Sequence, residues 1–189
     1  MRVDMTDGEL ALFAAFVSCS SRYLEFGSGG STYLAAQSTK EWIISVESSP
    51  EWVEKVTQNC AGLNGAIKIV HADIGPVKEF GHPIDAAQKS NWPTYHEAVW
   101  NEPNADNADF CFVDGRFRVA CFLQVLLRAK RPDIVIAIHD FSTRPHYHII
   151  LPFVRAIAVV ERLSIFVPRP GFDRHTAEIV LNNNRFRPD

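Results

Sequence analysis

Three observations predict an α/β fold built on a doubly wound, mostly parallel sheet. Short, continuous runs of β-branched apolar residues alternate with helix-forming segments along most of the chain. These runs have no polar face, which is typical of strands that helices cover on both sides. Near the C-terminal end, two apolar runs are separated only by PGFDRH, which is too short for a crossover helix. The last strand is therefore expected to be antiparallel, with helices on both faces of the sheet.

The first expected element is a helix over residues 6–20, because Thr6 and Glu9 have the spacing of a capping box and apolar residues follow at helical intervals. The apolar runs predict strands at 23–26, 42–47, 66–73, 108–114 and 133–140. Helices are expected to start at residue 31 and to cover 48–60 and 119–130. A further helix is expected near 147–162, before an antiparallel pair of strands at 163–169 and 176–183.

The chain has 189 residues, enough for one domain with a full hydrophobic core, so a single domain over residues 1–189 is expected. Residues 82–108 interrupt the alternation of strands and helices. Pro and Asn are frequent there, and Trp92, Tyr95 and Trp100 argue against disorder. Since long loops in compact domains are usually functional, we expect a partly helical lid over a substrate. The alternative is an insert that packs against a second subunit of a homo-oligomer.

Composition narrows the classes of function. Apolar residues make up 47% and charged residues 22% of the chain, as in globular proteins. A net charge of −3 and the lack of a Lys/Arg run argue against binding nucleic acid through its phosphates. No apolar stretch has the length of a membrane span, and the first residues lack the basic region of a signal peptide. Four cysteines without CxxC pairing fit a reduced, cytoplasmic protein.

The stretch YLEFGSGGSTYLAAQ, residues 23–37, joins the first predicted strand to a helix through a glycine-rich turn. Gly27, Gly29 and Gly30 allow a tight turn and let a ligand lie against the backbone. Ligands of open α/β sheets bind outside the carboxyl ends of the strands, where this turn is placed. The match to the dinucleotide-binding pattern GxGxxG is partial, because Thr32 takes the third glycine position.

An acid stands at or near the carboxyl end of three successive predicted strands. Glu25 precedes the glycine turn by two residues, where a cationic ligand is favoured over a pyrophosphate. The amino-acid end and sulfonium of S-adenosylmethionine make such a ligand. Glu47 ends the second strand and suits the two hydroxyls of a ribose, and Asp73 ends the third and suits an adenine amino group. Together the three acids indicate a nucleoside ligand with a cationic tail.

On these residues the chain resembles the class I (Rossmann-like) S-adenosylmethionine-dependent methyltransferases, most of all a small group with Val-Asp-Gly and His-Asp-aromatic ends on strands four and five. The resemblance covers about residues 20–185 and rests on LEFGSGGS (24–31), SVESSPEW (45–52), VHAD (70–73), FVDG (112–115) and AIHDF (137–141). It implies a seven-stranded sheet, S-adenosylmethionine as cofactor and methyl transfer to a small-molecule acceptor. The cofactor-binding residues that it implies are Glu25, Gly27, Ser28, Gly29, Gly30, Ser31, Glu47, Ser48, Asp73 and Ile74.

Methyl transfer depends mainly on positioning, plus removal of a proton from a hydroxyl or amine acceptor. The catalytic candidates therefore follow the fourth and fifth strands: Asp114, Arg116, His139 and Asp140. In one assignment, His139 or Asp140 is the general base and Asp114 orients the substrate, although a histidine here can equally be a hydrogen-bonded core residue. In related metal-dependent O-methyltransferases, carboxylates at the places of Asp114 and Asp140 hold a divalent cation, but Phe141 replaces the usual asparagine. A cation is therefore not favoured, and no metal ligand is assigned.

Arginines gather near the same strand ends. Arg116 and Arg118 follow the fourth strand, and Arg144 follows the fifth. Arginine binds carboxylates and phosphates through two parallel hydrogen bonds, so an anionic acceptor would fit, unless these side chains pair with local acids or face solvent. Two other functions stay open. One is a non-catalytic binding module that keeps the cofactor fold; the other is an NAD-dependent oxidoreductase, which Thr32 and the lack of a hydride-site Tyr-Lys or Cys pair disfavour.

Overall fold

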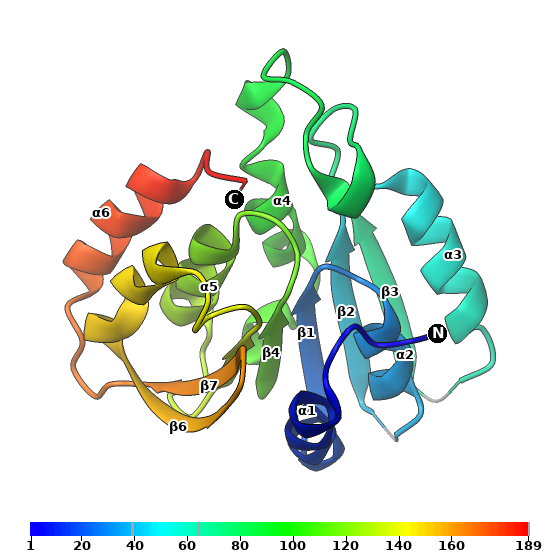
Figure 1. Cartoon of the computed structure of the whole chain (residues 1–189), viewed down its shortest axis with the longest axis horizontal. Coiled ribbons are helices and arrows are strands. Elements are labelled where there is room, and N and C mark those ends of the chain that lie inside the picture. The colour runs from blue at the N-terminus through cyan, green and yellow to red at the C-terminus, as the bar shows by residue number, and fades with distance from the viewer. Residues whose placement is uncertain (39, 64, 189) are drawn as a thin grey trace.

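Seven strands form one sheet in the computed structural model, which describes residues 1–38, 40–63 and 65–188 (Figure 1). The strands are β1 (Arg22–Phe26), β2 (Trp42–Glu47), β3 (Ala66–His71), β4 (Phe110–Val113), β5 (Val135–Ile138), β6 (Val154–Val160) and β7 (Leu163–Pro168). Their order across the sheet is β3-β2-β1-β4-β5-β7-β6. β7 is antiparallel to both of its neighbours, and the other neighbouring pairs are parallel. The predicted mostly parallel sheet with an antiparallel last strand is confirmed.

Helices cover both faces of this sheet. They are α1 (Asp7–Cys19), α2 (Gly30–Ala36), α3 (Pro50–Cys60), α4 (Thr94–Glu97), α5 (Arg118–Arg128) and α6 (Arg174–Asn184). Along β1, Tyr23 belongs to an apolar cluster with α1, α2 and α3, whereas Leu24 belongs to a second cluster with α5 and α6. The strand is therefore buried on both sides, which explains its continuous apolar sequence. Among the described residues, no helix has the length and apolar character needed to cross a bilayer.

Local sequence signals set the helix starts on one face. The Thr6 hydroxyl accepts a hydrogen bond from the Glu9 amide at 3.2 Å, and the Glu9 carboxylate accepts one from the Thr6 amide at 3.0 Å. This reciprocal pair is the predicted capping box, and α1 begins directly after Thr6. Ser49 caps α3 through its hydroxyl, and Pro50 occupies the first helical position. Both predicted helix starts are confirmed.

The C-terminal part of the chain differs from the prediction in two places. The expected helix near 147–162 is wrong, because Pro145–Phe153 forms a 3-10 segment and β6 follows it. The expected strand at 176–183 is also wrong, because it lies within α6. β6 and β7 form the hairpin instead, with Glu161 at a positive φ of 49° in their turn. Asp173 accounts for the helix, since its carboxylate accepts a hydrogen bond from the Thr176 amide at 3.1 Å and caps α6.

The insert over residues 82–108 is partly helical, as predicted, and lies at the top of Figure 1 in green. It contains α4 and short 3-10 segments at Lys89–Asn91, Ala98–Asn101 and Ala105–Asn107. Trp92 and Tyr95 are buried, and their rings lie 5.8 and 5.6 Å from that of Phe117, measured between centroids. The insert is thus anchored to the loop that leaves β4.

Glycines let the loops after β1 and β4 touch at the carboxyl edge of the sheet. Gly27 has a positive φ of 101°, and a Cβ there would lie only 2.6 Å from the Gly115 Cα. A Cβ on Gly115 would overlap the Tyr95 hydroxyl. These contacts bring the glycine turn, the β4 loop and the insert together at one place.

Gly115→Ala should destabilise the fold by about 1–3 kcal/mol, because the added methyl group overpacks the contact with Tyr95 and Gly27. Urea unfolding of the purified variant measures this change. In a Tyr95→Phe background the cost of Gly115→Ala should be smaller, since part of the overlap is with the missing hydroxyl. Equal costs in the two backgrounds would show that Tyr95 does not press on Gly115.

Candidate functional site

A cavity of about 890 Å³ opens at the carboxyl edge of the sheet. This volume lies in the range of small-molecule sites, about 300–1,000 Å³. Its walls come from segments that are far apart in the sequence: residues 2–4, the glycine turn at 27–31, residues between 47 and 52, the loop 77–82, and the residues after β4 and β5. They meet here because parallel strands end at the same edge of a sheet.

The glycine turn forms one wall of the cavity. The Trp52 indole N–H donates a hydrogen bond to the Ser28 carbonyl at 2.6 Å and holds the turn from the side of α3. The N-terminal segment crosses the turn so closely that a Cβ on Gly30 would overlap the Arg2 carbonyl. The residues that the sequence predicted for this turn all line the cavity: Gly27, Ser28, Gly29, Gly30 and Ser31.

Glu25 lies beneath the turn, and it is not part of the cavity wall. Its Oε1 accepts hydrogen bonds from the hydroxyls of Tyr23, at 2.9 Å, and Ser31. Its Oε2 accepts from the hydroxyls of Ser45, at 2.8 Å, and Thr32. Complete burial raises the pKa of Glu25 to about 7, although these hydrogen bonds oppose the rise. The structure thus places Glu25 close behind the turn, as expected, where it holds the start of α2 from below and does not line the cavity.

Glu47 ends β2 with its carboxylate at the cavity wall, as predicted. Its Oε1 accepts hydrogen bonds from the amides of Ser48 at 2.8 Å and Ser49 at 2.9 Å. Its Oε2 accepts one from the Ser28 hydroxyl at 3.4 Å. Burial raises the pKa of Glu47, and these hydrogen bonds oppose the rise. Two amides therefore fix one carboxylate oxygen, and the other faces the glycine turn.

Asp73 and Ile74, which were expected to follow Glu47 along the cavity, do not line it. β3 ends at His71, and Asp73 lies in the loop that follows the strand. The exposed Asp73 carboxylate accepts a hydrogen bond from the Gly75 amide at 3.0 Å, and Ile74 is buried in an apolar cluster. The loop 77–82 lines this side of the cavity instead. Sequence reasoning missed that loop because it carries no recognisable motif.

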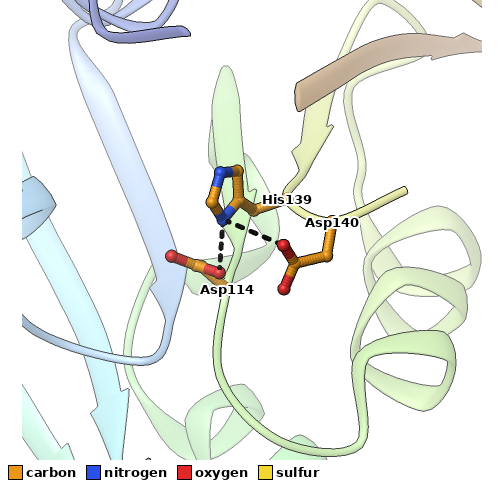
Figure 2. Close-up of side chains that lie close together, drawn as sticks. All are labelled: Asp114, His139 and Asp140. Carbon is orange, nitrogen blue, oxygen red and sulfur yellow. Dashed lines mark ion pairs between the residues drawn. The ribbon is translucent and has the colours of Figure 1, made fainter. Parts of the chain in front are cut away.

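Asp114, His139 and Asp140 come together at the ends of β4 and β5 (Figure 2). The His139 Nδ1 atom lies 3.2 Å from Asp114 Oδ1 and 3.9 Å from Asp140 Oδ1. The Nε2 atom lies 3.3 Å from Glu9 Oε2, an ion-pair distance without hydrogen-bond geometry. Burial lowers the pKa of His139, but the surrounding carboxylates outweigh burial and raise it above its ordinary value of 6.5. The ring is therefore favoured as an imidazolium.

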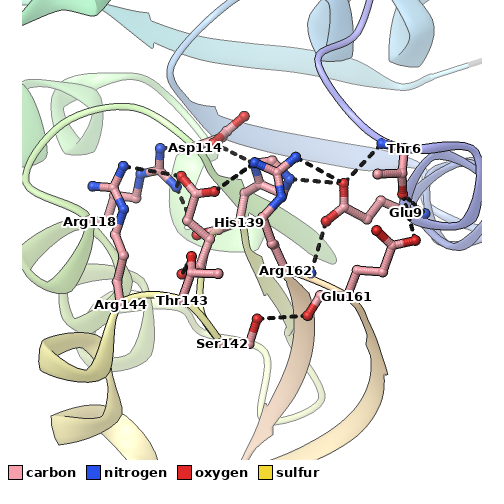
Figure 3. Close-up of polar contacts among 11 residues, drawn as sticks. Thr6, Glu9, Asp114, Arg118, His139, Ser142, Thr143, Arg144, Glu161 and Arg162 are labelled. Atoms are coloured by element: carbon pink, nitrogen blue, oxygen red, sulfur yellow. Dashed lines mark hydrogen bonds and ion pairs between the residues drawn. The ribbon is translucent and has the colours of Figure 1, made fainter.

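Arginines surround this cluster (Figure 3). Arg118 and Arg144 lie 3.2 and 3.3 Å from Asp140 Oδ2, and Arg162 lies 3.3 Å from Asp140 Oδ1. Arg118 is buried and also pairs with Asp114 Oδ1 at 3.1 Å. Burial raises the pKa of Asp114, but the positive charges of Arg118 and His139 outweigh it and lower the pKa below its usual value. The Asp114 carboxylate is thus held in its charged form by the network around it.

Glu9 and Arg162 belong to this network and were not expected from the sequence. The Glu9 carboxylate accepts a hydrogen bond from the Arg162 amide at 2.9 Å, from 153 positions away. Burial raises the pKa of Glu9, but hydrogen bonds from the amides of Thr6 and Arg162, together with His139, lower it to about 2. The capping box was the available signal in the sequence. It explains the contact with Thr6 and carries no information on the distant partners.

The same cluster has the spacing of a metal site, because ligand atoms of Asp114, His139 and Asp140 lie within 4.8 Å of one another. However, three guanidinium groups already pair with these carboxylates, and they would repel a divalent cation. Mg²⁺ also prefers a set of oxygen ligands over one that contains imidazole. The pairing of these carboxylates with arginines opposes a divalent cation, and we assign no step to one.

Solved structures show the family of this chain; no protein-family model and no curated protein matches it. A methyltransferase-like protein from Silicibacter pomeroyi DSS-3 is 30% identical over 99% of this chain and 98% of that chain, with a TM-score of 0.89. The chain belongs to the same family as this methyltransferase-like protein.

Two further methyltransferases share the fold. The N-methyltransferase NodS from Bradyrhizobium japonicum WM9 is 12% identical, over 88% of this chain and 99% of that chain, with a TM-score of 0.53. An RNA methyltransferase from Salinibacter ruber, solved in complex with S-adenosyl-L-homocysteine, is 15% identical, over 90% and 99% of the two chains, with a TM-score of 0.51.

In this chain, all four predicted catalytic residues line the cavity: Asp114, Arg116, His139 and Asp140. Their side chains differ in what they can do chemically. The carboxylates that raise the pKa of His139 favour its protonated form, which donates hydrogen bonds. Asp114 Oδ2 accepts no hydrogen bond from the described residues, and Figure 2 shows one Asp114 oxygen directed away from His139. Arg116 contacts the His82 ring, which joins the loop after β4 to the loop 77–82.

The raised pKa of His139 predicts a pH dependence of stability. Its contribution to the free energy of unfolding should be complete below pH 6.5 and should be lost as the pH rises through the folded-state pKa. His139→Gln removes the titrating group and should flatten this decline above pH 6.5 in urea unfolding at several pH values. His175→Gln, at an exposed position of α6, is the matched control and should keep the decline. An unchanged decline in His139→Gln would contradict the assignment.

Proposed function

We propose that this protein transfers the methyl group of S-adenosylmethionine to a small, anionic acceptor. The observation that carries the proposal is one cavity that joins the glycine turn and Glu47 to Asp114 and the arginines after β4 and β5. The 30% identity to a methyltransferase-like protein along nearly the whole chain supports it. The cofactor supplies an electrophilic methyl group on a sulfonium. The protein then has to bind and orient two molecules, which is catalysis by positioning.

We assign the cofactor to the part of the cavity between the glycine turn and Glu47. The bare backbone of Gly29 leaves room for a ligand against the turn, because the nearest atom to an added Cβ there is Trp52 Nε1 at 3.8 Å. Glu47 suits the ribose hydroxyls, because two amides hold its Oε1 while its Oε2 faces the turn. The hydroxyl-bearing Ser28 and Ser48 line the same wall. In this proposal Glu25 acts from beneath, by fixing the start of α2.

We assign the acceptor to the part of the cavity beyond β4 and β5. Four guanidinium groups line it against the two carboxylates of Asp114 and Asp140: Arg116, Arg118, Arg144 and Arg162. This excess of positive charge favours an anionic acceptor. The side chains of Arg144 and Arg162 are 32% and 38% exposed, so they can reach a carboxylate or phosphate of the acceptor. Asp114 Oδ2 is the oxygen placed to orient the acceptor or to take its proton.

A small molecule is preferred to a nucleic acid as the acceptor. The chain has a net charge of −3 and no run of Lys and Arg that would follow a phosphate backbone. Among the described residues no disulfide joins the cysteines Cys19, Cys60, Cys111 and Cys121, which supports a reducing, cytoplasmic location as part of the same proposal.

Calorimetric titration with S-adenosylmethionine, S-adenosylhomocysteine and NAD tests the cofactor. We expect micromolar binding of the two sulfur nucleotides and none of NAD. Glu47→Ala should weaken S-adenosylhomocysteine binding about ten- to a hundredfold, because a hydrogen bond to a charged acceptor contributes about 1.5–3 kcal/mol. Asp73→Ala is the matched control, and its affinity should stay within about threefold of wild type, because Asp73 lies outside the cavity.

The titration also has outcomes that would overturn the assignment. Unchanged affinity for S-adenosylhomocysteine in a folded Glu47→Ala variant would contradict the assignment of the cofactor to this part of the cavity. Binding of NAD alone would favour the oxidoreductase. In each case circular dichroism of the variant confirms that the fold is intact.

A non-catalytic binding module is the second candidate, and one observation favours it. His139 and Asp140 are engaged in ion pairs with one another and with arginines, which leaves them little capacity for proton transfer. Release of S-adenosylhomocysteine in the presence of a panel of small carboxylates and phosphates separates the two candidates. Cofactor binding without turnover on any acceptor of the panel would support the module.

Arg144→Gln should raise the KM for an anionic acceptor about tenfold or more and leave cofactor affinity unchanged, because the variant loses a charged hydrogen-bond donor at the acceptor end. Steady-state release of S-adenosylhomocysteine measures KM and kcat. Arg155→Gln, at an exposed position of β6, is the control and should match wild type. A lower kcat with an unchanged KM would contradict the placement of Arg144 at the acceptor.

A further inference from the structure

A second cavity, of about 340 Å³, lies between α4, α5 and α6. Among the described residues, it shares no lining residue with the cavity at the sheet edge. Three arginines line it: Arg128 at the end of α5, Arg174 at the start of α6 and Arg185 just after α6. Two acids, Glu97 and Glu178, also line it, so positive side chains exceed negative ones in its wall.

A buried polar chain forms the floor of this cavity. The Gln124 carbonyl oxygen accepts a hydrogen bond from Arg128 Nε at 2.7 Å, and the Gln124 amide nitrogen lies 3.2 Å from His96 Nδ1. The other ring nitrogen of His96 lies 3.3 Å from the Arg185 carbonyl oxygen. Burial lowers the pKa of His96 to about 4, so the ring is neutral at pH 7. A neutral ring accepts at Nδ1 and donates at Nε2, which links Arg128 to the Arg185 backbone in one ordered chain.

The arginines are held in place by contacts that leave other donors unused. The Arg128 guanidinium lies 5.7 Å from the centroid of the Trp100 ring, and Arg174 donates to a main-chain carbonyl of α5. Arg185 pairs with Glu97 through one terminal nitrogen at 3.1 Å, while its Nε is buried without a hydrogen-bond partner in the described part of the chain. Each guanidinium has five N–H donors, more than these contacts with described residues use. Guanidinium groups that line one cavity are suited to bind a carboxylate or phosphate.

We propose that this cavity is a second binding site, for a small molecule that carries a carboxylate or phosphate group. The floor is pre-ordered by buried hydrogen bonds, so little conformational freedom is lost when an anion binds. Leu127 and Leu181 add an apolar part of the wall for a short carbon skeleton. Glu178 has no hydrogen bond or ion pair with the described residues, and its negative charge limits the affinity for an anion.

Calorimetric titration of the wild-type protein with inorganic phosphate and with succinate, at constant ionic strength, tests this proposal. Binding of phosphate alone would identify a phosphate ligand, and binding of succinate alone a dicarboxylate; either result supports the site if Arg144→Gln keeps the binding and Arg128→Gln weakens it. Arg128→Gln should weaken the binding about tenfold or more, because a charged donor is lost. Arg155→Gln, on the exposed edge of β6, is the matched control and should bind like wild type.

Glu178→Gln provides a test in which the expected result is tighter anion binding, and a misfolded variant would not bind more tightly. Removing an unpaired acid from the wall should tighten anion binding by up to about fivefold. Arg144→Gln distinguishes this cavity from the one at the sheet edge, and it should leave the binding unchanged. Failure of both probes to bind the wild-type protein would overturn the proposal. Binding that is lost in Arg144→Gln and kept in Arg128→Gln would overturn it as well.

Discussion

The buried guanidinium of Arg118 holds together the ends of β4 and β5, and the arrangement of the site depends on it. It pairs with Asp114 at 3.1 Å and with Asp140 at 3.2 Å, and it donates to the carbonyl oxygens of Gly115 and His139. Burying a charged group costs several kcal/mol unless opposite charges and hydrogen bonds compensate it. Arg118 meets that condition by pairing with acids at both strand ends, and its charge lowers the pKa of Asp114 at the edge of an apolar sheet. The same pairing opposes the binding of a divalent cation there.

From this centre the network reaches elements that are distant in the chain. His139 lies between Asp114 and Glu9, so its positive charge links the end of β4 to the start of α1. Glu9 in turn binds the main chain of Arg162, in the turn between β6 and β7. A residue that begins a helix by capping it thus also anchors that helix to the sheet edge. The charged side chains at this edge therefore serve the fold and the proposed chemistry together, which is why stability and catalysis need separate measurements.

The insert separates the two cavities and contributes to both. Within α4, Tyr95 lines the cavity at the sheet edge, and its neighbour His96 lines the cavity between the helices. Phe117 lies between these regions, with its ring near those of Tyr95 and His96 and its amide donating to the Pro188 carbonyl at 3.4 Å. The aromatic residues that set this segment apart in the sequence are therefore packing residues first. They position the β4 loop by filling the space beneath it.

The sequence by itself determined the alternation of strands and helices, the glycine turn at the carboxyl edge, and the arrival of Glu47, Asp114, Arg116, His139 and Asp140 at one cavity. Local capping chemistry and the rule that parallel strands end at one edge are sufficient for those conclusions. Tertiary structure alone decided that β6 pairs with β7, that Glu25 and Asp73 do not line the cavity, and that Glu9 meets His139. The contact of Glu9 depends on a partner more than a hundred positions away, and the other outcomes depend on the path of loops; residue spacing carries no information on either.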